Sequence, residues 1–350
     1  MKANSTRERS GERTWQLLEL LADGEFHSGE LLAQQLGISR ASVFNALVDV
    51  AEQGIVLQRI RGRGYRLARP WHRLEQHKIL HGLGREAATF DIDIQLEAPS
   101  SNTLLLQRAA NGAPSGSVLA VELQTAGRGR LGRTWQSGLG NALTFSLLWR
   151  FDGGLNTLSG LSLAVGVAIV RALKKLGAQG VYLKWPNDIL ATQGKLGGVL
   201  IEAQGDMLGP SAVVIGIGLN CSLPPGWEQR IDQPVSALNE ICDPVPERNR
   251  LLSSLLLELA SVLQQFARQG FAEMRAEWES HHLHQDQPVT LNMPDGSHVS
   301  GIARGISSIG ELCIETAKGV RSFNSGELGT TALHPIPQSA RSSGAARIRG

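Results

Sequence analysis

The chain has 350 residues, of which 42% are hydrophobic and 19% are charged, and its formal net charge is +2 at pH 7. This length accommodates two or three domains, each with its own core. The nearly balanced charge excludes a protein that binds polyanions over its whole surface, so any nucleic-acid site must be local.

Three features bear on the cellular compartment. Residues 1–11 are polar and charged, so we expect no secretory signal. The most apolar stretch, residues 155–173, is interrupted by serine, glycine and arginine and is typical of a buried helix, not a membrane span. The three cysteines are odd in number, widely spaced and without metal-ligand spacing. We therefore expect reduced thiols, a cytoplasmic location and no membrane partner.

The N-terminal region, residues 10–69, has the pattern of a winged helix-turn-helix. Apolar residues at helical spacing over 15–21 end at an Asp-Gly pair. Two further helices are expected over 29–36 and 40–52, each behind a serine that can cap it. A strand, a tight turn at 61–64 and a short return strand then form the wing.

Local charge in this region favours DNA binding. Residues 57–69 contain five arginines and no acidic residue, so the wing can neutralise phosphates. Asp49 and Glu52 make the third helix less basic, so we expect modest affinity or dependence on dimerisation. The alternative is a winged helix that only covers the catalytic domain or binds protein. The candidate DNA-binding residues are Ser39, Arg40, Ser42, Asn45, Arg61 and Arg63.

The remainder of the chain predicts an α+β multidomain protein. Residues 70–85 are expected to be a linker whose histidines lack metal-ligand spacing. Strands alternate with helices over 86–280, which predicts a central mixed α/β domain. Short apolar runs separated by turns over 285–331 are typical of a small β-barrel. The polar, basic tail at 332–350 is expected to be disordered.

Four segments of the central domain place groups that can bind ligands beside glycine or proline. They are Gly-Arg-Gly-Arg from Gly127, Lys-Trp-Pro-Asn-Asp from Lys184, Lys-Leu-Gly-Gly from Lys195 and Gly-Ile-Gly-Leu-Asn from Gly216. Alone, the first segment is also compatible with a disordered RNA-binding tail. In this order the four resemble the catalytic domain of the biotin-protein ligases. Over residues 10–331 the chain resembles the bifunctional bacterial branch, with a winged helix-turn-helix, a ligase domain and an SH3-like C-terminal β-barrel.

The resemblance implies an ATP-dependent, AMP-forming ligase. Biotin and ATP form biotinyl-5'-AMP, with Mg²⁺ accompanying ATP, and biotin then passes to a lysine of the biotin carboxyl carrier protein of acetyl-CoA carboxylase. A carboxylate attacking a phosphate needs fixed positive charge more than an acid or base. The resemblance assigns the biotin carboxylate and the α-phosphate to Lys195. Asp188 has three open roles: orienting Lys195, accepting the carrier lysine's proton, or holding Mg²⁺. The candidate catalytic residues are Lys195, Arg128, Arg130, Lys184 and Asp188.

Binding candidates come from the same segments. The biotin candidates are Ser100, Ser101, Asn102, Gln124, Arg128, Gly197 and Gly198. The ATP and adenylate candidates are Arg130, Arg133, Trp135, Lys184, Asn187 and Asn220, where Trp135 either stacks on adenine or anchors the loop as a core indole. The chain departs from the family pattern in two places. Leu131 replaces a residue that is basic in some members, which removes one possible charge from the loop. Residues 235–238 lack an aromatic cap, which weakens the expectation of ligand-coupled dimerisation.

We expect a bifunctional protein whose biotinyl-AMP is both intermediate and corepressor, with operator DNA and a second copy of the chain as partners. One alternative is a ligase with an accessory winged helix. Another is a ligand-sensing transcription factor, against which Lys184 and Lys195 argue. Lipoate ligation is a third, disfavoured by the Gly-Arg-Gly-Arg loop.

Overall fold

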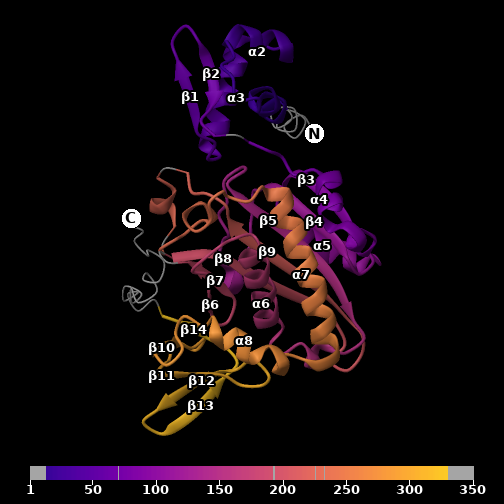
Figure 1. Ribbon diagram of the computed structural model, residues 1–350, viewed down its shortest axis with the longest axis vertical. Helices are drawn as coiled ribbons and strands as arrows, with labels where there is room; N and C mark the ends of the chain where they lie inside the picture. The colour runs from indigo at the N-terminus through magenta and orange to yellow at the C-terminus, as the bar shows by residue number, and fades with distance from the viewer. Residues whose placement is uncertain (1–12, 70, 192–193, 225, 232, 330–350) are drawn as a thin grey trace, which may run out of the picture.

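The computed structural model describes residues 13–69, 71–191, 194–224, 226–231 and 233–329. Figure 1 shows three parts along the long axis: a small helical part with a two-stranded ribbon, a large central sheet with its helices, and a smaller sheet at the far end. This arrangement confirms the predicted fold class of winged helix, α/β ligase domain and C-terminal SH3-like domain.

The N-terminal part forms the predicted winged helix-turn-helix. Residues 13–21 are helical and precede α2 (Gly29–Leu36) and α3 (Arg40–Glu52). The two predicted caps are present: Leu31 N–H donates to Ser28 Oγ, and Ser42 N–H donates to Ser39 Oγ. The wing is an antiparallel pair of β1 (Leu57–Ile60) and β2 (Gly64–Leu67).

The central sheet has seven strands in the order β3-β4-β5-β9-β8-β7-β6. The pair β3–β4 is parallel and the other neighbours are antiparallel, so the sheet is mixed, as predicted. The strands are β3 (Asp91–Ala98), β4 (Ser117–Gln124), β5 (Ala142–Phe151), β6 (Tyr182–Lys184), β7 (Asp188–Ala191), β8 (Gly194–Gly205) and β9 (Ser211–Asn220).

Helices cover both faces of this sheet. On one face, α5 (Ser101–Ala110) packs Leu105 against Leu119 and Leu148. The other face packs against α6 (Leu161–Lys175) and α7 (Arg248–Gln269), which lie side by side in Figure 1, with α8 (Arg275–Ser280) beyond them. Successive residues of a strand point to opposite faces of the sheet, so they pack into two separate hydrophobic cores. Within the described ranges, no helix is both long and apolar enough to cross a membrane.

The C-terminal part is a five-stranded antiparallel sheet in the order β13-β12-β11-β10-β14. Its apolar side chains belong to the same continuous core as those of α6 and α7, so the two parts pack tightly. The strands are β10 (Pro288–Asn292), β11 (His298–Ile306), β12 (Leu312–Thr316), β13 (Gly319–Phe323) and β14 (Glu327–Leu328). The tail expected to be disordered lies outside the described residues.

The segment expected to be a linker is packed on both sides. Trp71 belongs to the N-terminal core, whereas Leu74 and Ile79 are buried in the central core. Residues of α4 (Gln76–Leu83) pack along α7. The connection thus contributes to both cores instead of spanning open solvent. The prediction of a linker rested on the polar, histidine-rich composition of this segment and gave too little weight to its few large apolar residues.

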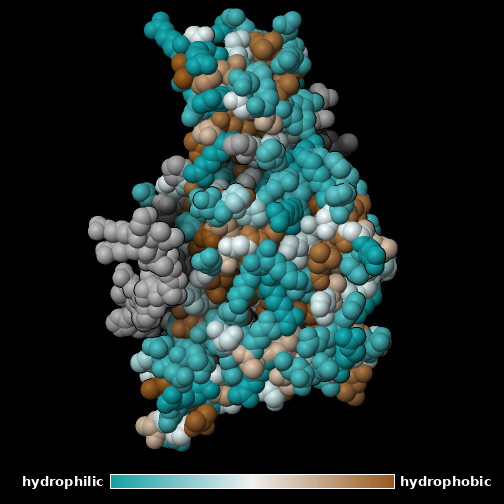
Figure 2. All heavy atoms as spheres, in the orientation of Figure 1, coloured by the Kyte–Doolittle hydropathy of each residue, from teal (hydrophilic) through white to brown (hydrophobic). Residues whose placement is uncertain are grey.

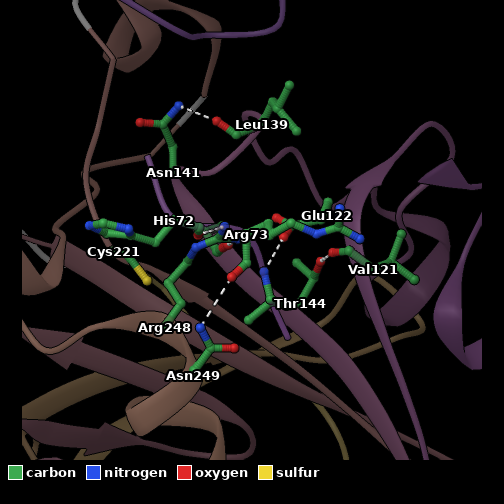
Figure 3. A network of polar contacts seen from close by, with 12 residues as sticks. His72, Arg73, Val121, Glu122, Leu139, Asn141, Thr144, Cys221, Arg248 and Asn249 are labelled. Carbon is green, nitrogen blue, oxygen red and sulfur yellow. Dashed lines mark hydrogen bonds and ion pairs between the residues drawn. The ribbon is translucent and has the colours of Figure 1, made fainter. Parts of the chain in front are cut away.

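A buried ion pair fastens this segment to the central domain (Figure 3). Arg248 Nη1 lies 2.6 Å from Glu122 Oε2, and both side chains are almost fully buried. The other Glu122 oxygen accepts a 2.6 Å hydrogen bond from Leu74 N–H, and Arg248 Nη2 donates to the carbonyl of His72 at 2.7 Å. The pair therefore holds residues 72–74 through both of its charged groups.

Candidate active site

A cavity of about 720 Å³ opens at one edge of the central sheet. It is lined by the start of α5, the loop after β4, the β6–β7 turn, strands β8 and β9, and part of the C-terminal sheet. Every residue proposed for catalysis, biotin or ATP lines it, with Gly197 as the one exception. The fold thus brings together segments that are more than 100 residues apart in the sequence.

Gly197 lies on the other face of β8. A Cβ there would stand 2.4 Å from Leu219 Cδ2 and 2.5 Å from the carbonyl oxygen of Gly218, both in the neighbouring strand. A Cβ on Gly198 would instead stand 3.5 Å from Lys195 Cε. The expectation of close ligand approach therefore fits Gly198, whereas glycine at 197 permits close strand packing.

The serine and asparagine at the start of α5 form a polar cluster at the back of the cavity. Ser101 N–H donates to Gln124 Oε1 at 2.8 Å. The hydroxyl of Ser146, in β5, donates to Asn102 Oδ1 at 2.6 Å, and its oxygen lies 2.7 Å from Ser101 Oγ, within hydrogen-bond distance. Ser100 caps the helix. Fixed donors and acceptors of this kind suit a small polar ring better than a charged group.

Glycine at 216 makes space for that cluster. A Cβ at this position would stand 2.2 Å from Asn102 Oδ1. Ser146 itself was not foreseen, because a serine inside an apolar strand carries no local motif.

Arg128 closes one side of this cluster. Its guanidinium makes two hydrogen bonds to Glu202, of 2.7 and 3.2 Å, and one of 3.1 Å to Thr103 Oγ1. The neighbouring Asn102 Nδ2 donates to Glu202 Oε2 at 3.0 Å. Glu202 therefore orients both a predicted biotin residue and a predicted catalytic arginine, a role that the sequence did not reveal.

The arginine loop is a short hairpin. Gly129 N–H donates to the Arg133 carbonyl at 2.7 Å and Trp135 N–H to the Gly127 carbonyl at 2.9 Å. The backbone amides of Gly129 and Trp135 therefore bond within the loop, and neither is free to face an anion. A Cβ on Gly127 would lie 2.5 Å from the Trp135 carbonyl oxygen. Positive charge at the cavity thus comes from the side chains.

The loop also meets the C-terminal sheet. Arg133 forms an ion pair with Glu327 of β14, and Asn292 and Leu328 of the same sheet line the cavity. None of these three C-terminal residues was foreseen, because β10 and β14 contain no ligand-binding motif. The cavity is therefore shared by two domains.

Lys195 lies on β8 beside a carboxylate. Its Nζ is 2.7 Å from Asp188 Oδ1, and both side chains are mostly buried. Its backbone is fixed from both sides: Lys195 N–H donates to the Pro234 carbonyl, and its carbonyl accepts from Ser236 N–H, each at 2.9 Å. Asn220 Nδ2 donates to the carbonyls of Ser236, at 3.1 Å, and Lys195, at 3.3 Å.

Two cations that line the cavity, Lys184 and Arg130, have lowered pKa values. Burial lowers the pKa of Lys184 against the attraction of Asp188, and the charge of Lys195 lowers it further. Burial also lowers the pKa of Arg130, which donates a 3.0 Å hydrogen bond to Asn187 Oδ1. Desolvated cations in a cleft are strong candidates for binding a polyanion, because charge is screened less there than in water.

Trp135 packs on the floor of the cavity. A Cβ on Gly218 would stand 2.5 Å from its ring, so glycine is needed for the indole to lie against β9. This geometry leaves both sequence-based roles of Trp135 open, because an indole seated on the sheet both anchors the loop and presents a ring edge to the cavity.

Three carboxylates line or border the cavity, and each holds a cationic side chain: Asp188 with Lys195, Glu202 with Arg128, and Glu327 with Arg133. Among the residues that the structure describes, no group of three or more histidine, cysteine or acidic side chains is arranged to hold a metal ion.

The predicted DNA-binding residues lie on α3 and the wing. Ser39 and Ser42 share a 2.9 Å hydrogen bond at the helix cap, and Arg40 pairs with Glu30 at 2.7 Å. Asn45 is exposed on α3 and Arg61 is exposed at the wing turn. Arg63 stacks over Phe26 at 4.5 Å from the ring centre, as Arg66 does at 4.6 Å.

Comparison with known proteins identifies related sequences for all three parts. The family models that match are the Biotin/lipoate A/B protein ligase family over residues 96–220, the Biotin protein ligase C terminal domain over 284–328, and an HTH domain over 13–66. The bifunctional ligase/repressor BirA of Escherichia coli is 35% identical over 313 residues, covering 89% of this chain and 95% of that protein.

Two other relatives match about two thirds of this chain. The biotin–[acetyl-CoA-carboxylase] ligase of Mycobacterium tuberculosis is 35% identical over 238 residues, covering 67% of this chain and 86% of that protein. The solved biotin protein ligase from Aquifex aeolicus, in complex with biotin and ATP, has a TM-score of 0.59 and 28% identity, covering 68% of this chain and 97% of that chain.

Proposed function

The chain belongs to the biotin protein ligase family, in its bifunctional ligase/repressor branch, and on that premise we propose how its residues divide the work. It is an ATP-dependent, AMP-forming biotin–protein ligase joined to a DNA-binding domain. One observation carries the assignment of roles: a cluster of neutral polar side chains and a set of cationic side chains line the same cavity.

Biotin binding is proposed for the α5 end of the cavity. The ring of biotin carries a neutral urea group, which both donates and accepts hydrogen bonds. Ser101, Asn102 and Gln124 offer matching groups already held in place by Ser146 and by one another. Ser100 acts mainly as the cap that aims this cluster, and Gly198 leaves room for the biotin side chain to reach Lys195.

Formation of the adenylate is proposed to depend on positive charge. The attacking carboxylate and the α-phosphate repel one another, and charge builds on the phosphoryl oxygens as the new bond forms. Lys195 bridges the two reacting groups, while Lys184 and Arg130 hold the phosphates that leave as pyrophosphate. Partial burial supports these roles, because desolvated cations stabilise developing negative charge more strongly.

Arg128 and Arg133 are proposed to close over the bound nucleotide, with Trp135, Asn187 and Asn220 around its adenosine half. The ion pairs of the two arginines with Glu202 and Glu327 hold the loop beside the cavity. A closed loop would shield the mixed anhydride from water and from bystander lysines.

Asp188 is proposed to position Lys195 and then to accept the proton of the carrier lysine. The 2.7 Å separation from Lys195 Nζ supports the first role. The carrier amine must lose a proton as it attacks the acyl group, and Asp188 is the carboxylate that directly borders Lys195. Mg²⁺ bound with ATP would neutralise charge on the phosphates, and Asp188 is the side chain proposed to help hold it.

The second role is repression of biotin synthesis. We propose operator DNA, the biotin carboxyl carrier protein and a second copy of this chain as partners, with biotinyl-AMP favouring the dimer. The boundaries proposed for the domains are 10–69, 86–280 and 285–331, with residues 70–85 between the first two, and the proposed location is the cytoplasm. The basic wing supports a local DNA site.

Transfer of biotin to a purified biotin carrier domain tests the ligase roles. The intact chain should transfer biotin in the presence of ATP and Mg²⁺, and should not transfer lipoate. Lys195→Ala should lose at least about a hundredfold in rate, the range for removing one preorganised charge from a transition state. Arg321→Ala, in β13 outside the cavity, is the matched control. Equal rates for Lys195→Ala and Arg321→Ala would contradict the assignment of Lys195.

A further inference from the structure

The outward face of the recognition helix α3 carries two large apolar side chains. Phe44 is 46% exposed and Val48 is 40% exposed, although Val43, Leu47 and Val50 already supply the buried face of the same helix. Residues four apart lie on one side of a helix, so Phe44 and Val48 form a stripe. We call these two residues the apolar stripe. It serves no core of the described structure.

Large exposed apolar side chains are concentrated around this helix. Of the eleven in the described residues, five lie between residues 31 and 60: Leu31, Phe44, Val48, Val56 and Ile60. In the view of Figure 2, hydrophobic atoms interrupt the hydrophilic surface of the N-terminal part. Clustered exposure of this kind marks an interaction surface more often than scattered single residues do.

Arg59 connects the apolar stripe to the wing. Its guanidinium carbon lies 5.9 Å from the ring centre of Phe44 and 5.6 Å from that of Tyr65. Stacking on two rings holds the charge at the border between α3 and the wing. An anion that follows the wing would therefore run beside the apolar stripe.

Few polar groups of α3 remain to recognise hydrogen-bonding edges. Ser39 and Ser42 bond to each other at the cap, and Arg40 is paired with Glu30. Asn45 is exposed next to Phe44. Besides Asn45, the acidic Glu52 and the half-buried Asp49, the large side chains that this helix leaves exposed after its first turn are those of the apolar stripe.

Duplex DNA presents one strongly apolar group in its major groove, the 5-methyl group of thymine, and phenylalanine and small apolar side chains contact it. The arginines of residues 57–69, with no acidic residue among them, favour a polyanion over a protein partner on this side of the domain. Phosphate contacts place the helix, and the apolar stripe is then left facing the bases.

We propose that Phe44 and Val48 read thymine methyl groups in the major groove and thereby set the sequence preference of the winged helix, while Arg59 contacts the adjacent phosphate. This inference rests on the proposed repressor function and deepens it, since it names the chemical group that the recognition helix selects. Asn45 adds the polar contact beside the apolar stripe.

The test begins with selection of binding sequences from a random duplex DNA library by the full chain, supplied with biotin, ATP and Mg²⁺. Each thymine of the selected site is then replaced by deoxyuridine, which removes only the methyl group. We expect about a fourfold loss of affinity at each contacted position, as for one buried methyl group. Phe44→Ala should weaken binding and abolish sensitivity to deoxyuridine at one or two positions, whereas Phe44→Leu should retain part of it.

Ile309→Ala is the matched control, because Ile309 is 54% exposed but lies in the C-terminal part. It should leave affinity and deoxyuridine sensitivity unchanged. Selection that succeeds while deoxyuridine has no effect, or has the same effect in Phe44→Ala, would overturn the inference and spare the repressor. If no sequence is enriched, DNA recognition itself fails, and a protein partner for the apolar stripe replaces it.

Discussion

The buried pair of Glu122 and Arg248 makes a quantitative prediction about stability. Glu122→Gln keeps the shape of the side chain and removes its charge, which leaves the guanidinium of Arg248 in the core without a counter-charge. Burial alone would lower the pKa of Arg248, but the attraction of Glu122 and the hydrogen bond to it, with smaller attractions from nearby groups, together raise that pKa, so the arginine stays charged. Breaking a buried pair in this way costs about 3–5 kcal/mol. The free energy of unfolding should fall by that amount.

A double-mutant cycle separates the pair from its surroundings. Arg248→Met alone strands the carboxylate and should cost about as much as Glu122→Gln. The double variant Glu122→Gln with Arg248→Met removes both charges, keeps an acceptor for the N–H of Leu74 and leaves mainly the carbonyl of His72 without a partner, at about 1–3 kcal/mol. The double variant should therefore lose less than the sum of the single losses, with a coupling of a few kcal/mol.

Urea unfolding followed by circular dichroism measures the cycle, and limited proteolysis reports on the connection itself. In both single variants, cleavage at Arg73 should become faster, because the contacts of residues 72–74 with the central domain are weakened. Losses below about 1 kcal/mol, or single losses that simply add in the double variant, would refute this reasoning. Arg108→Met provides a control, since its pair with Asp93 is largely exposed and should contribute little.

Three other predictions follow from neighbouring features. Burial, assisted by the charge of His284, lowers the pKa of His282 to about 3. Below the ordinary pKa of 6.5 the unfolded chain therefore binds more protons than the folded chain, and the free energy of unfolding should fall by about 2 kcal/mol from pH 7 to pH 5. His282→Leu should reduce this pH dependence when stability is measured by urea unfolding. An unchanged slope would contradict a buried neutral imidazole. Gly218→Ala should displace Trp135 and raise the KM for ATP, whereas Gly29→Ala, whose Cβ meets only ordinary contact, should not; equal kinetics in both would refute the packing argument. Glu327→Gln should free Arg133 and accelerate hydrolysis of bound biotinyl-AMP in a retention assay, and unchanged retention would show that this pair does not hold the loop.

Local chemistry made the winged helix predictable almost to the residue. Serine caps precede both α2 and α3, and Gly37 ends α2 in a left-handed conformation that glycine favours. The wing was equally predictable, since two short strands flank a glycine-rich turn. The ends of these helices and strands depend on a few neighbouring residues, so the sequence alone is enough to predict them.

The cavity was only partly predictable, because it depends on contacts between residues that are far apart in the sequence. Residues inside motifs, such as Lys195 and Asp188, were found from sequence. Ser146, Glu202 and Glu327 were missed, because each lies outside these motifs and acts by holding a side chain that lines the cavity. Their contribution arises from strand pairing and domain packing over long sequence distances.

The central claim is that one cavity makes the adenylate and uses Lys195 to do so. The most direct measurement mixes the intact chain with biotin and α-labelled ATP in Mg²⁺, without carrier, and follows protein-bound biotinyl-AMP by rapid quench. The account predicts formation of bound adenylate that disappears when a biotin carrier domain is added, and severe loss of the formation step in Lys195→Ala. Adenylate formation at the normal rate in Lys195→Ala would contradict the account.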